Sequence, residues 1–293
     1  MIQILTVISL FALWTSSWAQ NYPVKPIKIL VGFSPGGVPD IAARVIAQKL
    51  TDKWGQAVVV ENKLGAGSNI AAQVLANSAA DGYTLLSISS AHAIAPSIYS
   101  KLPFDPQKDF SGVSLTSTGP AFVIVAPNLG VNNMNEFLAL ARSKPGQLNF
   151  ASAGTGSGSH FAIELLKSQT NIDLVHIPFK GIPEALTETM AGRTHIFISP
   201  YATAVQLVKE GKAKAIAVTS TSRVMDFPDL PTVAESGVPG YKWIFWYAML
   251  APAKTPKAIL DKLHSEIANI LKMNICVYKI QKVTPHPTPV SIL

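Results

Sequence analysis

The stretch Ile27–Asp40 reads I-K-I-L-V-G-F-S-P-G-G-V-P-D. Its first five residues, Ile27–Val31, are mostly apolar and predict a buried strand, which a loop rich in glycine and proline follows. Gly36 and Gly37 let the backbone turn tightly, and Asp40 is predicted to cap the next helix. Because the N–H groups and dipole at a helix start favour an anion, the loop predicts a carboxylate or phosphate site. An ordinary strand-to-helix turn would carry the same residues.

A second stretch repeats this pattern. Leu148–His160 reads L-N-F-A-S-A-G-T-G-S-G-S-H, again a strand that enters a glycine loop and then a helix-like segment. After each loop we predict the same order of helix, strand, helix and strand. These elements are Ile41–Lys53, Ala57–Glu61, Asn69–Ser78 and Thr84–Ser89 in the first copy, and His160–Ser168, Asp173–Pro178, Pro183–Ala191 and His195–Ser199 in the second. The repeat predicts an α/β fold with two lobes that face one ligand across a cleft.

The two loops and the nearby strand ends supply the candidate ligand-binding residues. Glycines let a ligand approach the backbone, hydroxyl groups donate hydrogen bonds, and the carboxyl ends of strands are where open α/β sheets bind ligands. The predicted site comprises Phe33, Ser34, Gly36, Gly37, Asp40, Ser89 and His92 from the first copy, and Gly154, Thr155, Gly156, Ser157, Ser159, His160 and Ser199 from the second.

Two features near this site have alternative interpretations. His160 opens a predicted helix, where its ring either donates to a ligand or lies in solvent. Trp243, Phe245, Trp246 and Tyr247 form an aromatic cluster that either lines the cleft or packs in the core or between the lobes.

The chain is predicted to pass between the lobes twice. We expect the first crossover at the strand Phe122–Ala126 and the second at Lys214–Thr219. An amphipathic helix, Pro256–Leu271, follows. The predicted lobes are residues 20–122 with 225–272, and residues 123–224. Residues 273–293 form an atypical tail in which Pro285, Pro287 and Pro289 exclude a helix.

The N-terminus has the pattern of a secretory signal peptide. Residues 1–19 hold a short apolar run, and Ser17 and Ala19 are small residues placed for cleavage before Gln20. A buried N-terminal helix is the alternative, and the run is too short for a membrane span. Cys276 is the sole cysteine, which excludes an intrachain disulfide and a thiolate metal cluster. An exported chain of this size without disulfides suits the periplasm.

Composition and motifs exclude several classes of function. The net charge is +7, but its 24 Lys and Arg residues show no dense run, which argues against a nucleic-acid partner. The six histidines have no H-x-x-x-H or H-E-x-x-H spacing, so no metal is predicted. A dinucleotide fingerprint and a Walker A motif are absent, so no cofactor is expected. Ser157 fails the G-x-S-x-G pattern because Thr155 and Ser159 flank it.

Several motifs in order resemble one family. Tyr22–Arg44, Gly55–Asn62 (G-Q-A-V-V-V-E-N), Gly65–Ala71 (G-A-G-S-N-I-A), His176–Gly181 (H-I-P-F-K-G) and Leu230–Gly237 (L-P-T-V-A-E-S-G) are similar to segments of the Bug-type, or TctC-like, receptors. These receptors are the periplasmic solute-binding components of tripartite tricarboxylate transporters. The resemblance runs from about Tyr22 to about Lys272 and then decays.

The resemblance implies a two-lobed periplasmic-binding-protein fold, type II-like, that closes on a small carboxylate held largely by backbone N–H groups and waters. It also implies a non-catalytic monomer whose partners are membrane transporter subunits. Two alternatives stay open. One is a receptor that feeds a sensor or another carrier, and the other is a hydrolase on the same scaffold that uses Ser157 and His160.

Overall fold

The computed structural model describes residues 22–273, so the predicted signal peptide and all but Met273 of the predicted tail lie outside the described residues. The strands are β1 (Ile27–Val31), β2 (Val58–Asn62), β3 (Thr84–Ser89), β4 (Phe110–Gly119), β5 (Ala121–Val125), β6 (Asn149–Ser152), β7 (Val175–Pro178), β8 (Ile196–Pro200), β9 (Lys214–Val218) and β10 (Phe245–Pro252). The helices are α2 (Val38–Trp54), α3 (Asn69–Ala76), α4 (Ala91–Ile98), α5 (Met134–Ser143), α6 (Gly158–Thr170), α7 (Ile182–Met190), α8 (Tyr201–Lys209) and α9 (Lys257–Lys272), with short 3-10 turns η1 (Ala66–Ser68) and η2 (Pro127–Leu129).

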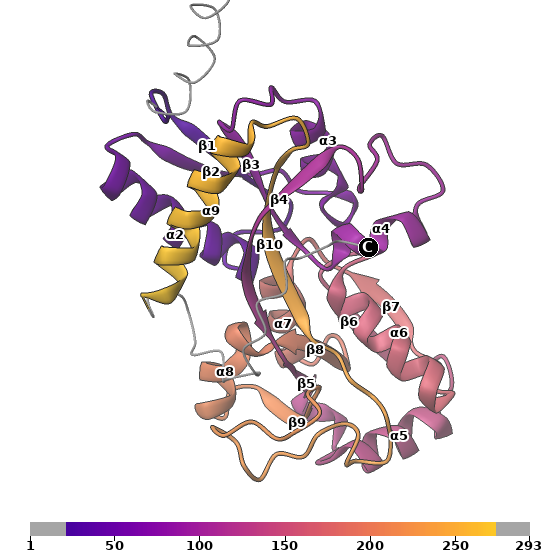
Figure 1. Ribbon diagram of the computed structural model, residues 1–293. Coiled ribbons are helices and arrows are strands. Elements are labelled where there is room, and N and C mark those ends of the chain that lie inside the picture. Colours follow the sequence, from indigo (N-terminus) through magenta and orange to yellow (C-terminus); the bar gives the residue numbers. More distant parts are fainter. Residues whose placement is uncertain (1–21, 274–293) are drawn as a thin grey trace, which may run out of the picture.

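The strands form two five-stranded sheets, one in each lobe, which confirms the predicted two-lobed α/β fold (Figure 1). The strand order is β2-β1-β3-β10-β4 in the first sheet and β7-β6-β8-β5-β9 in the second. In each lobe the strand before the glycine loop lies between the two strands that follow it in the chain, and these pairs are parallel. An antiparallel strand comes next in each sheet, β10 beside β3 and β5 beside β8. The repeat seen in the sequence is therefore a repeat of sheet topology.

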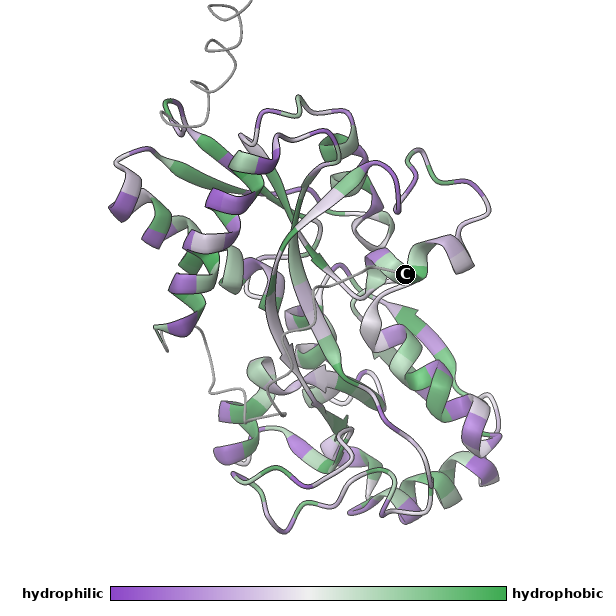
Figure 2. Ribbon diagram, viewed as in Figure 1, coloured by the Kyte–Doolittle hydropathy of each residue, from purple (hydrophilic) through white to green (hydrophobic). Residues whose placement is uncertain are grey.

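Each central strand is buried on both faces, as its unbroken apolar run predicts. On one face of the first sheet, Ile29 packs with α2 and α9 through Ile46 and Leu263. On the other face, Leu30 packs with Leu75 of α3. Figure 2 shows the same arrangement as hydrophobic strands inside each lobe and hydrophilic residues on the outer faces of the helices. This packing fixes the ends of β1 and β6, where the two glycine loops begin.

The lobes are joined by long strands that we had not predicted. β4 and β10 pair antiparallel over most of their length (Figure 1). The chain leaves the first sheet at the end of β4 and enters the second at β5, so the first crossing lies just before the predicted strand. It returns after β9, through residues 219–244, to β10.

The segment before β10 packs on the second lobe. Thr232 forms a β-bridge with Val218 of β9, and Val233 and Tyr241 are buried in the core of the second sheet. We had expected residues 225–244 to belong to the first lobe, so this packing differs from the predicted boundary. The second crossover was expected at Lys214–Thr219, whereas the chain rejoins the first sheet only at β10.

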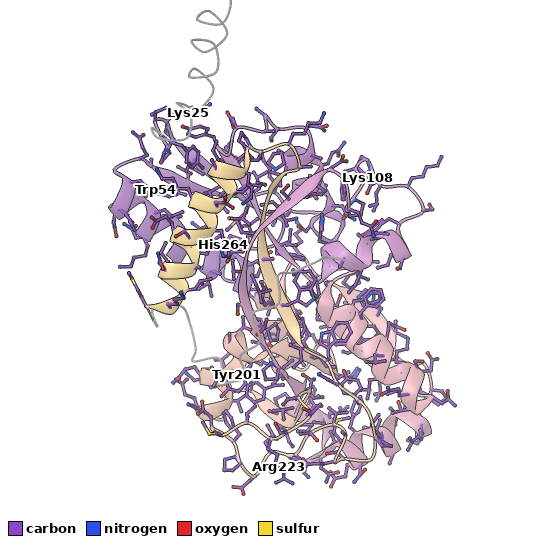
Figure 3. The ribbon with its side chains drawn as sticks, in the orientation of Figure 1. Lys25, Trp54, Lys108, Tyr201, Arg223 and His264 are labelled. Atoms are coloured by element: carbon purple, nitrogen blue, oxygen red, sulfur yellow. The ribbon has the colours of Figure 1, made fainter. Side chains whose placement is uncertain are left out.

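Helix α9 covers the first sheet at the edge formed by β4. His264 on this helix hydrogen-bonds through its Nδ1 to the carbonyl of Val113, at 2.8 Å, and Figure 3 labels it at that position. The predicted amphipathic helix Pro256–Leu271 is confirmed to within one residue at each end. Within residues 22–273, no helix combines the length and apolar character that a bilayer span requires.

Candidate functional site

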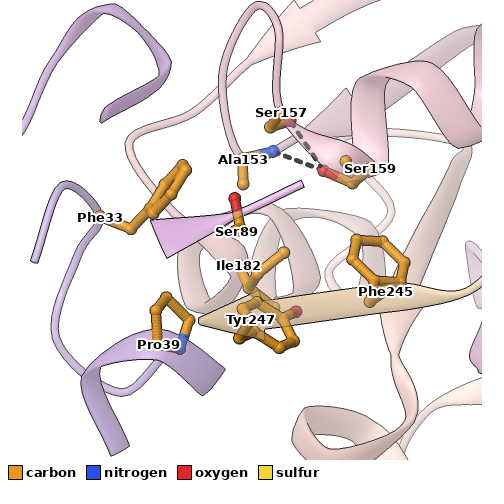
Figure 4. Close-up of a pocket in the computed structure, with 11 residues that line it drawn as sticks. Phe33, Pro39, Ser89, Ala153, Ser157, Ser159, Ile182, Phe245 and Tyr247 are labelled. Carbon is orange, nitrogen blue, oxygen red and sulfur yellow. Dashed lines mark hydrogen bonds between the residues drawn. The ribbon is translucent and has the colours of Figure 1, made fainter. Parts of the chain in front are cut away.

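A pocket lies between the lobes and is lined from both sheets (Figure 4). Counted out to its solvent opening, the space between its atoms is about 350 Å³. All of its lining side chains are uncharged. They are Phe33, Gly37, Pro39, Ser89, Ala153, Ser157, Gly158, Ser159, Ile182, Phe245 and Tyr247.

The first glycine loop is held in shape by Asp40. Helix α2 begins at Val38, so Asp40 is the third helical residue and not the cap that we predicted. Its buried carboxylate accepts a hydrogen bond from the backbone N–H of Gly36 at 3.0 Å, and both oxygens accept from Arg44. Burial alone would raise the pKa of Asp40, but hydrogen bonds from Arg44, Gly36 and Asn62 lower it overall. Asp40 therefore stabilises the conformation of the first glycine loop.

Asn62 ties this loop to the next strand. Its amide nitrogen donates to the carbonyl of Phe33 and to the Asp40 carboxylate, both at 2.9 Å. Gly36 adopts a φ of +85°, which confirms that the turn needs glycine at that position.

The second glycine loop is organised by hydroxyl groups. Ser157 caps α6, and its Oγ accepts the backbone N–H of His160 at 3.3 Å. The Oγ of Ser159 accepts the N–H of Ala153 at 2.9 Å and lies 3.1 Å from the Ser157 Oγ, as Figure 4 shows. As the first two residues of α6, Gly158 and Ser159 have N–H groups with no intrahelical acceptor. These groups are available to a ligand.

Each loop contains a hydrogen bond of the same kind, from a glycine N–H to a side chain four residues later. In the second loop, the Nδ1 of His160 accepts the N–H of Gly156 at 3.3 Å. In the first loop, the Asp40 carboxylate accepts the N–H of Gly36, which likewise lies four residues earlier in the chain. A neutral imidazole thus stands in the second lobe where a carboxylate stands in the first. His160 also stacks on His176, with ring centroids 4.1 Å apart, and burial lowers its pKa, so the ring is held neutral.

The lobes touch on two sides of the pocket, as in a closed binding protein. On one side, the N–H of Ser34 donates to the carbonyl of Lys180 at 3.4 Å. On another, the Tyr99 hydroxyl donates to the carbonyl of Thr155 at 3.3 Å. Glycine is required at such contacts, since a Cβ on Gly67 would lie 2.7 Å from the same Thr155 oxygen.

Five of the predicted residues line the pocket, namely Phe33, Gly37, Ser89, Ser157 and Ser159. Four others lie where the lobes meet, namely Ser34 against Gly181, Gly36 against Pro183, and Thr155 and Gly156 against Tyr99. Gly154 adopts a φ of +116° inside the second loop.

The structure places the remaining predicted residues outside the pocket lining. His92 is buried between Phe104 and Phe110, 5.9 Å and 4.9 Å away between ring centroids. Ser199 is fully buried, and its hydroxyl lies 3.1 Å from that of Thr203. Asp40 and His160 act on the loops, as described above. Ligand contact by these residues stays a prediction.

Six lining residues were not in the predicted site. They are Pro39, Ala153, Gly158, Ile182, Phe245 and Tyr247. The aromatic cluster had suggested the last two, but without a predicted strand their direction was open. Along β10, alternate residues face the same way, so Phe245 and Tyr247 both reach the pocket. Among the described residues, the Tyr247 hydroxyl has no hydrogen-bond partner, which leaves it free for a ligand.

The described residues bring together no group of three or more His, Cys, Asp or Glu side chains that could hold a metal ion. Ser157 and His160 are adjacent, but the contact joins the serine hydroxyl to the backbone N–H of His160. The ring nitrogen Nδ1 accepts from Gly156 instead. The pair therefore lacks the hydroxyl-to-imidazole contact of an activated nucleophile.

Comparison with known proteins agrees with this geometry. Residues 42–286 match the family model described as "Tripartite tricarboxylate transporter family receptor". The match continues past Lys272, where we expected the resemblance to decay, so that expectation was wrong. Protein BugT of Bordetella pertussis is 34% identical over 271 residues, covering 91% of this chain and 83% of BugT. A protein of the tcbD-tcbE intergenic region of a Pseudomonas species is 34% identical over 269 residues, covering 90% of this chain and 80% of that protein.

Solved structures give the same result. Rpa4515 of R. palustris with adipate has a TM-score of 0.81 at 33% identity, covering 84% of this chain and 83% of the other. MatC from Rhodopseudomonas palustris with bound malate has a TM-score of 0.81 at 32% identity, covering 85% of each chain. The periplasmic binding protein BugD has a TM-score of 0.80 at 33% identity, covering 85% of this chain and 83% of BugD.

Proposed function

Since this chain belongs to the tripartite tricarboxylate transporter receptor family, we propose that it binds a small carboxylate between its lobes and delivers it to a membrane transporter. The observation that carries the proposal is the interlobe pocket. Helix starts from both lobes meet there, so backbone N–H groups and helix dipoles provide the positive potential that an anion needs. The ligand-bound relatives, with adipate and with malate, support the same class of ligand.

Binding is coupled to closure in this proposal. A ligand that contacts Ser159 of the second lobe and Phe33 of the first makes more contacts in the closed form than in an open one. The ligand therefore shifts the population toward the closed form by its differential affinity. A membrane partner that recognises the closed form would then bind the receptor only when the site holds a ligand.

The chain acts in the periplasm as a monomer and without catalysis, in our proposal. The signal-peptide pattern before Gln20 supports export. The hydrogen bonds of Ser157 and His160 support a binding role, since the imidazole nitrogen Nδ1 already accepts a hydrogen bond from the N–H of Gly156 and not from the Ser157 hydroxyl. A receptor that serves a sensor would have the same pocket, and a pull-down from membranes would identify the integral protein retained.

The test is a melting-temperature screen of residues 20–293 against small carboxylates, including adipate and malate. A ligand at about 100 times its dissociation constant stabilises the folded state by about 2.7 kcal/mol, which raises the melting temperature by several degrees. The diamide of adipic acid is the matched control, because it has the same length and lacks the charge. A cooperative melt that no acid shifts would contradict the proposal. Release of a chemically altered ligand, detected by mass spectrometry, would contradict the non-catalytic part alone.

A further inference from the structure

The hydroxyl group of Tyr247 sets this residue apart from the other tyrosines of residues 22–273. Each of the others has a hydrogen-bond partner for its hydroxyl: Tyr22 with Gly82, Tyr83 with Val24, Tyr99 with Thr155, Tyr201 with Asp226 and Tyr241 with Ala162. The hydroxyl of Tyr247 has none within the described residues, although Tyr247 is only 4% exposed. In this part of the chain, the tyrosine without a partner is therefore also the one that lines the interlobe pocket.

The direction of the Tyr247 side chain is fixed by the strands on both sides of it. β10 pairs with β3 and β4, and Tyr247 lies opposite Ser89 of the one and Ser117 of the other. The ring stacks on that of Phe245, with centroids 6.5 Å apart and planes within 11° of parallel, and Figure 4 shows both rings at the pocket. A ring packed in this way has little room to move. Its hydroxyl therefore stays at the pocket.

A second hydroxyl, that of Ser89, lies beside Tyr247 in the same sheet. Residues directly opposite each other in an antiparallel pair point to the same face, and both of these residues line the pocket. The Ser89 Oγ accepts the N–H of Ala91 at 3.3 Å, and its own proton has no acceptor within the described residues. The other side chains that the first lobe contributes to the lining are apolar. The first lobe therefore presents two hydroxyl donors to the pocket from adjacent strands.

Other hydroxyl groups near the cleft do not have this combination of features. Those of Ser34, Ser68 and Ser90 also lack partners, but each is packed against a glycine, and none of them lines the pocket. In the second lobe, the hydroxyls of Ser157 and Ser159 bond to each other and to backbone N–H groups. Tyr247 is therefore the pocket-lining residue whose hydroxyl makes no hydrogen bond of any kind within the described residues.

A donor at this place requires an acceptor when the lobes close. Burial raises the pKa of Tyr247 well above its usual range, so the hydroxyl keeps its proton and can donate it. Leaving such a donor unpaired in a closed pocket is costly, and a hydrogen bond from it removes that cost. None of the lining side chains is a carboxylate that could accept this proton. The bound ligand is the group that can supply the acceptor.

A ligand that couples binding to closure contacts both lobes. In the second lobe, Phe245 lies against Gly158 at the start of α6, since a Cβ on that glycine would lie 2.8 Å from the Cε1 of Phe245. Tyr247 is the next residue of β10 on the same face. The ring of Phe245 therefore lies between the second glycine loop and Tyr247, so a ligand that bridges the lobes reaches these two places with different groups.

We infer that Tyr247 is a specificity-determining residue that donates a hydrogen bond to an acceptor oxygen on the body of the bound acid, with Ser89 as a second donor beside it. The inference rests on the proposed function, since it names what the same site selects. An acid that carries such an oxygen, in a hydroxyl group or in a second carboxylate, binds more tightly than an alkanoate of the same length. The alkanoate leaves the Tyr247 hydroxyl buried and unpaired.

The test compares acids that share a chain length and one carboxylate. Dissociation constants are measured by calorimetry for hexanoate, 6-hydroxyhexanoate and adipate, and for butyrate, 4-hydroxybutyrate, succinate and malate. The parent chain is expected to bind an oxygen-bearing acid at least about tenfold more tightly than the alkanoate of its series. Tyr247→Phe should weaken that acid about tenfold and leave the alkanoate within about twofold. A loss confined to hydroxy acids assigns the oxygen to a hydroxyl group, and a loss confined to diacids assigns it to a carboxylate.

Two outcomes would overturn the inference and leave the proposed function standing. In the first, the alkanoates bind to the parent chain as tightly as the other acids of their series. In the second, Tyr247→Phe weakens all acids of a series equally or weakens none of them. If none of the acids binds to a chain that melts cooperatively, the proposed function is overturned as well.

The matched control makes the same change at Tyr241, which is buried in the core of the second lobe and donates to the carbonyl of Ala162 at 2.7 Å. Tyr241→Phe loses this hydrogen bond, so the melting temperature of the free chain should fall while the preference among the acids is unchanged. Tyr247→Phe loses no hydrogen bond within the described residues, so the melting temperature of its free chain should match that of the parent. A fall as large as that of Tyr241→Phe, with all acids weakened equally, would make Tyr247 a structural residue.

A second variant tests the share of Ser89. Ser89→Ala should weaken the preferred acid about threefold and leave the alkanoate unchanged, because it removes one neutral donor. Ser117→Ala changes the residue on the other side of Tyr247, outside the pocket lining, and should leave both affinities unchanged. Equal affinities of these two variants for the preferred acid would remove Ser89 from the donor pair.

Discussion

At the scale of the residue, Gly158 is required because the lobes approach too closely for a side chain. A Cβ at this position would lie 2.7 Å from the Ser90 Oγ and 2.8 Å from Cε1 of Phe245, both on the first lobe. Gly158→Ala should therefore oppose closure while leaving each lobe folded. Overpacking costs about 1–3 kcal/mol, so carboxylate affinity should fall roughly tenfold. Calorimetry gives the affinity, and small-angle scattering should report a more open molecule.

Gly112→Ala is the matched control for this change. A Cβ on Gly112 would meet no atom within 4 Å, and its φ is not positive. The control should bind like the parent chain. A Gly158→Ala variant that binds equally well would show that the close approach is not needed for binding.

At the scale of the element, the helices and strands that were predicted correctly are those that a local sequence pattern determines. The strand-loop-helix units at β1 and β6 follow from apolar runs that end in glycine loops, and the repeat of their order predicted two sheets. β4 was missed because Phe110–Gly119 is rich in serine and threonine and lies at a sheet edge, where burial imposes no apolar alternation. β10 was missed because its pairing with β3 joins residues far apart in the sequence.

The same limit applies to the site. The loop residues Phe33, Gly37 and Ser157 could be predicted, since each follows directly from a local motif. Tyr247 could not be assigned, because its direction depends on the register of β10. Asp40 was placed correctly near the loop but was predicted to cap the helix. Because α2 begins three residues earlier than predicted, Asp40 lies inside the first turn and stabilises the loop instead.

The role of Asp40 predicts a loss of stability. Asp40→Ala removes the acceptor of the Gly36 N–H and the partner of Arg44 and Asn62. Hydrogen bonds to a buried charge contribute about 1.5–3 kcal/mol, and we expect a loss of about 2–3 kcal/mol in the free energy of unfolding by urea. Asp52→Ala, which removes an exposed acid from the same helix, should change it by less than about 0.5 kcal/mol. Equal effects of the two changes would refute the supporting role.

At the scale of the whole molecule, buried histidines predict how stability depends on pH. Burial lowers the pKa of His92 to about 4, and burial together with the nearby His160 lowers that of His176 to about 4, from 6.5. Above pH 6.5 both rings are neutral in the folded and the unfolded chain. As the pH falls from 6.5 toward 4, the unfolded chain takes up protons that the folded chain refuses, so the melting temperature should fall throughout this range.

His92→Phe separates this effect from that of the carboxyl groups. The pKa of Asp40 is lowered from 3.8, so the stability that its carboxylate contributes is lost only below the interval in which the histidines act. Phenylalanine fits a site between Phe104 and Phe110, and it removes one group that resists protonation. Between pH 6.5 and 4.5 the melting temperature of the variant should therefore fall less than that of the parent chain. Plotted against pH, the two melting temperatures should be closest at pH 7. If the melting temperatures of the two chains fell in parallel over this interval, His92 would be protonated in the folded chain, and the lowered pKa of His92 would be refuted.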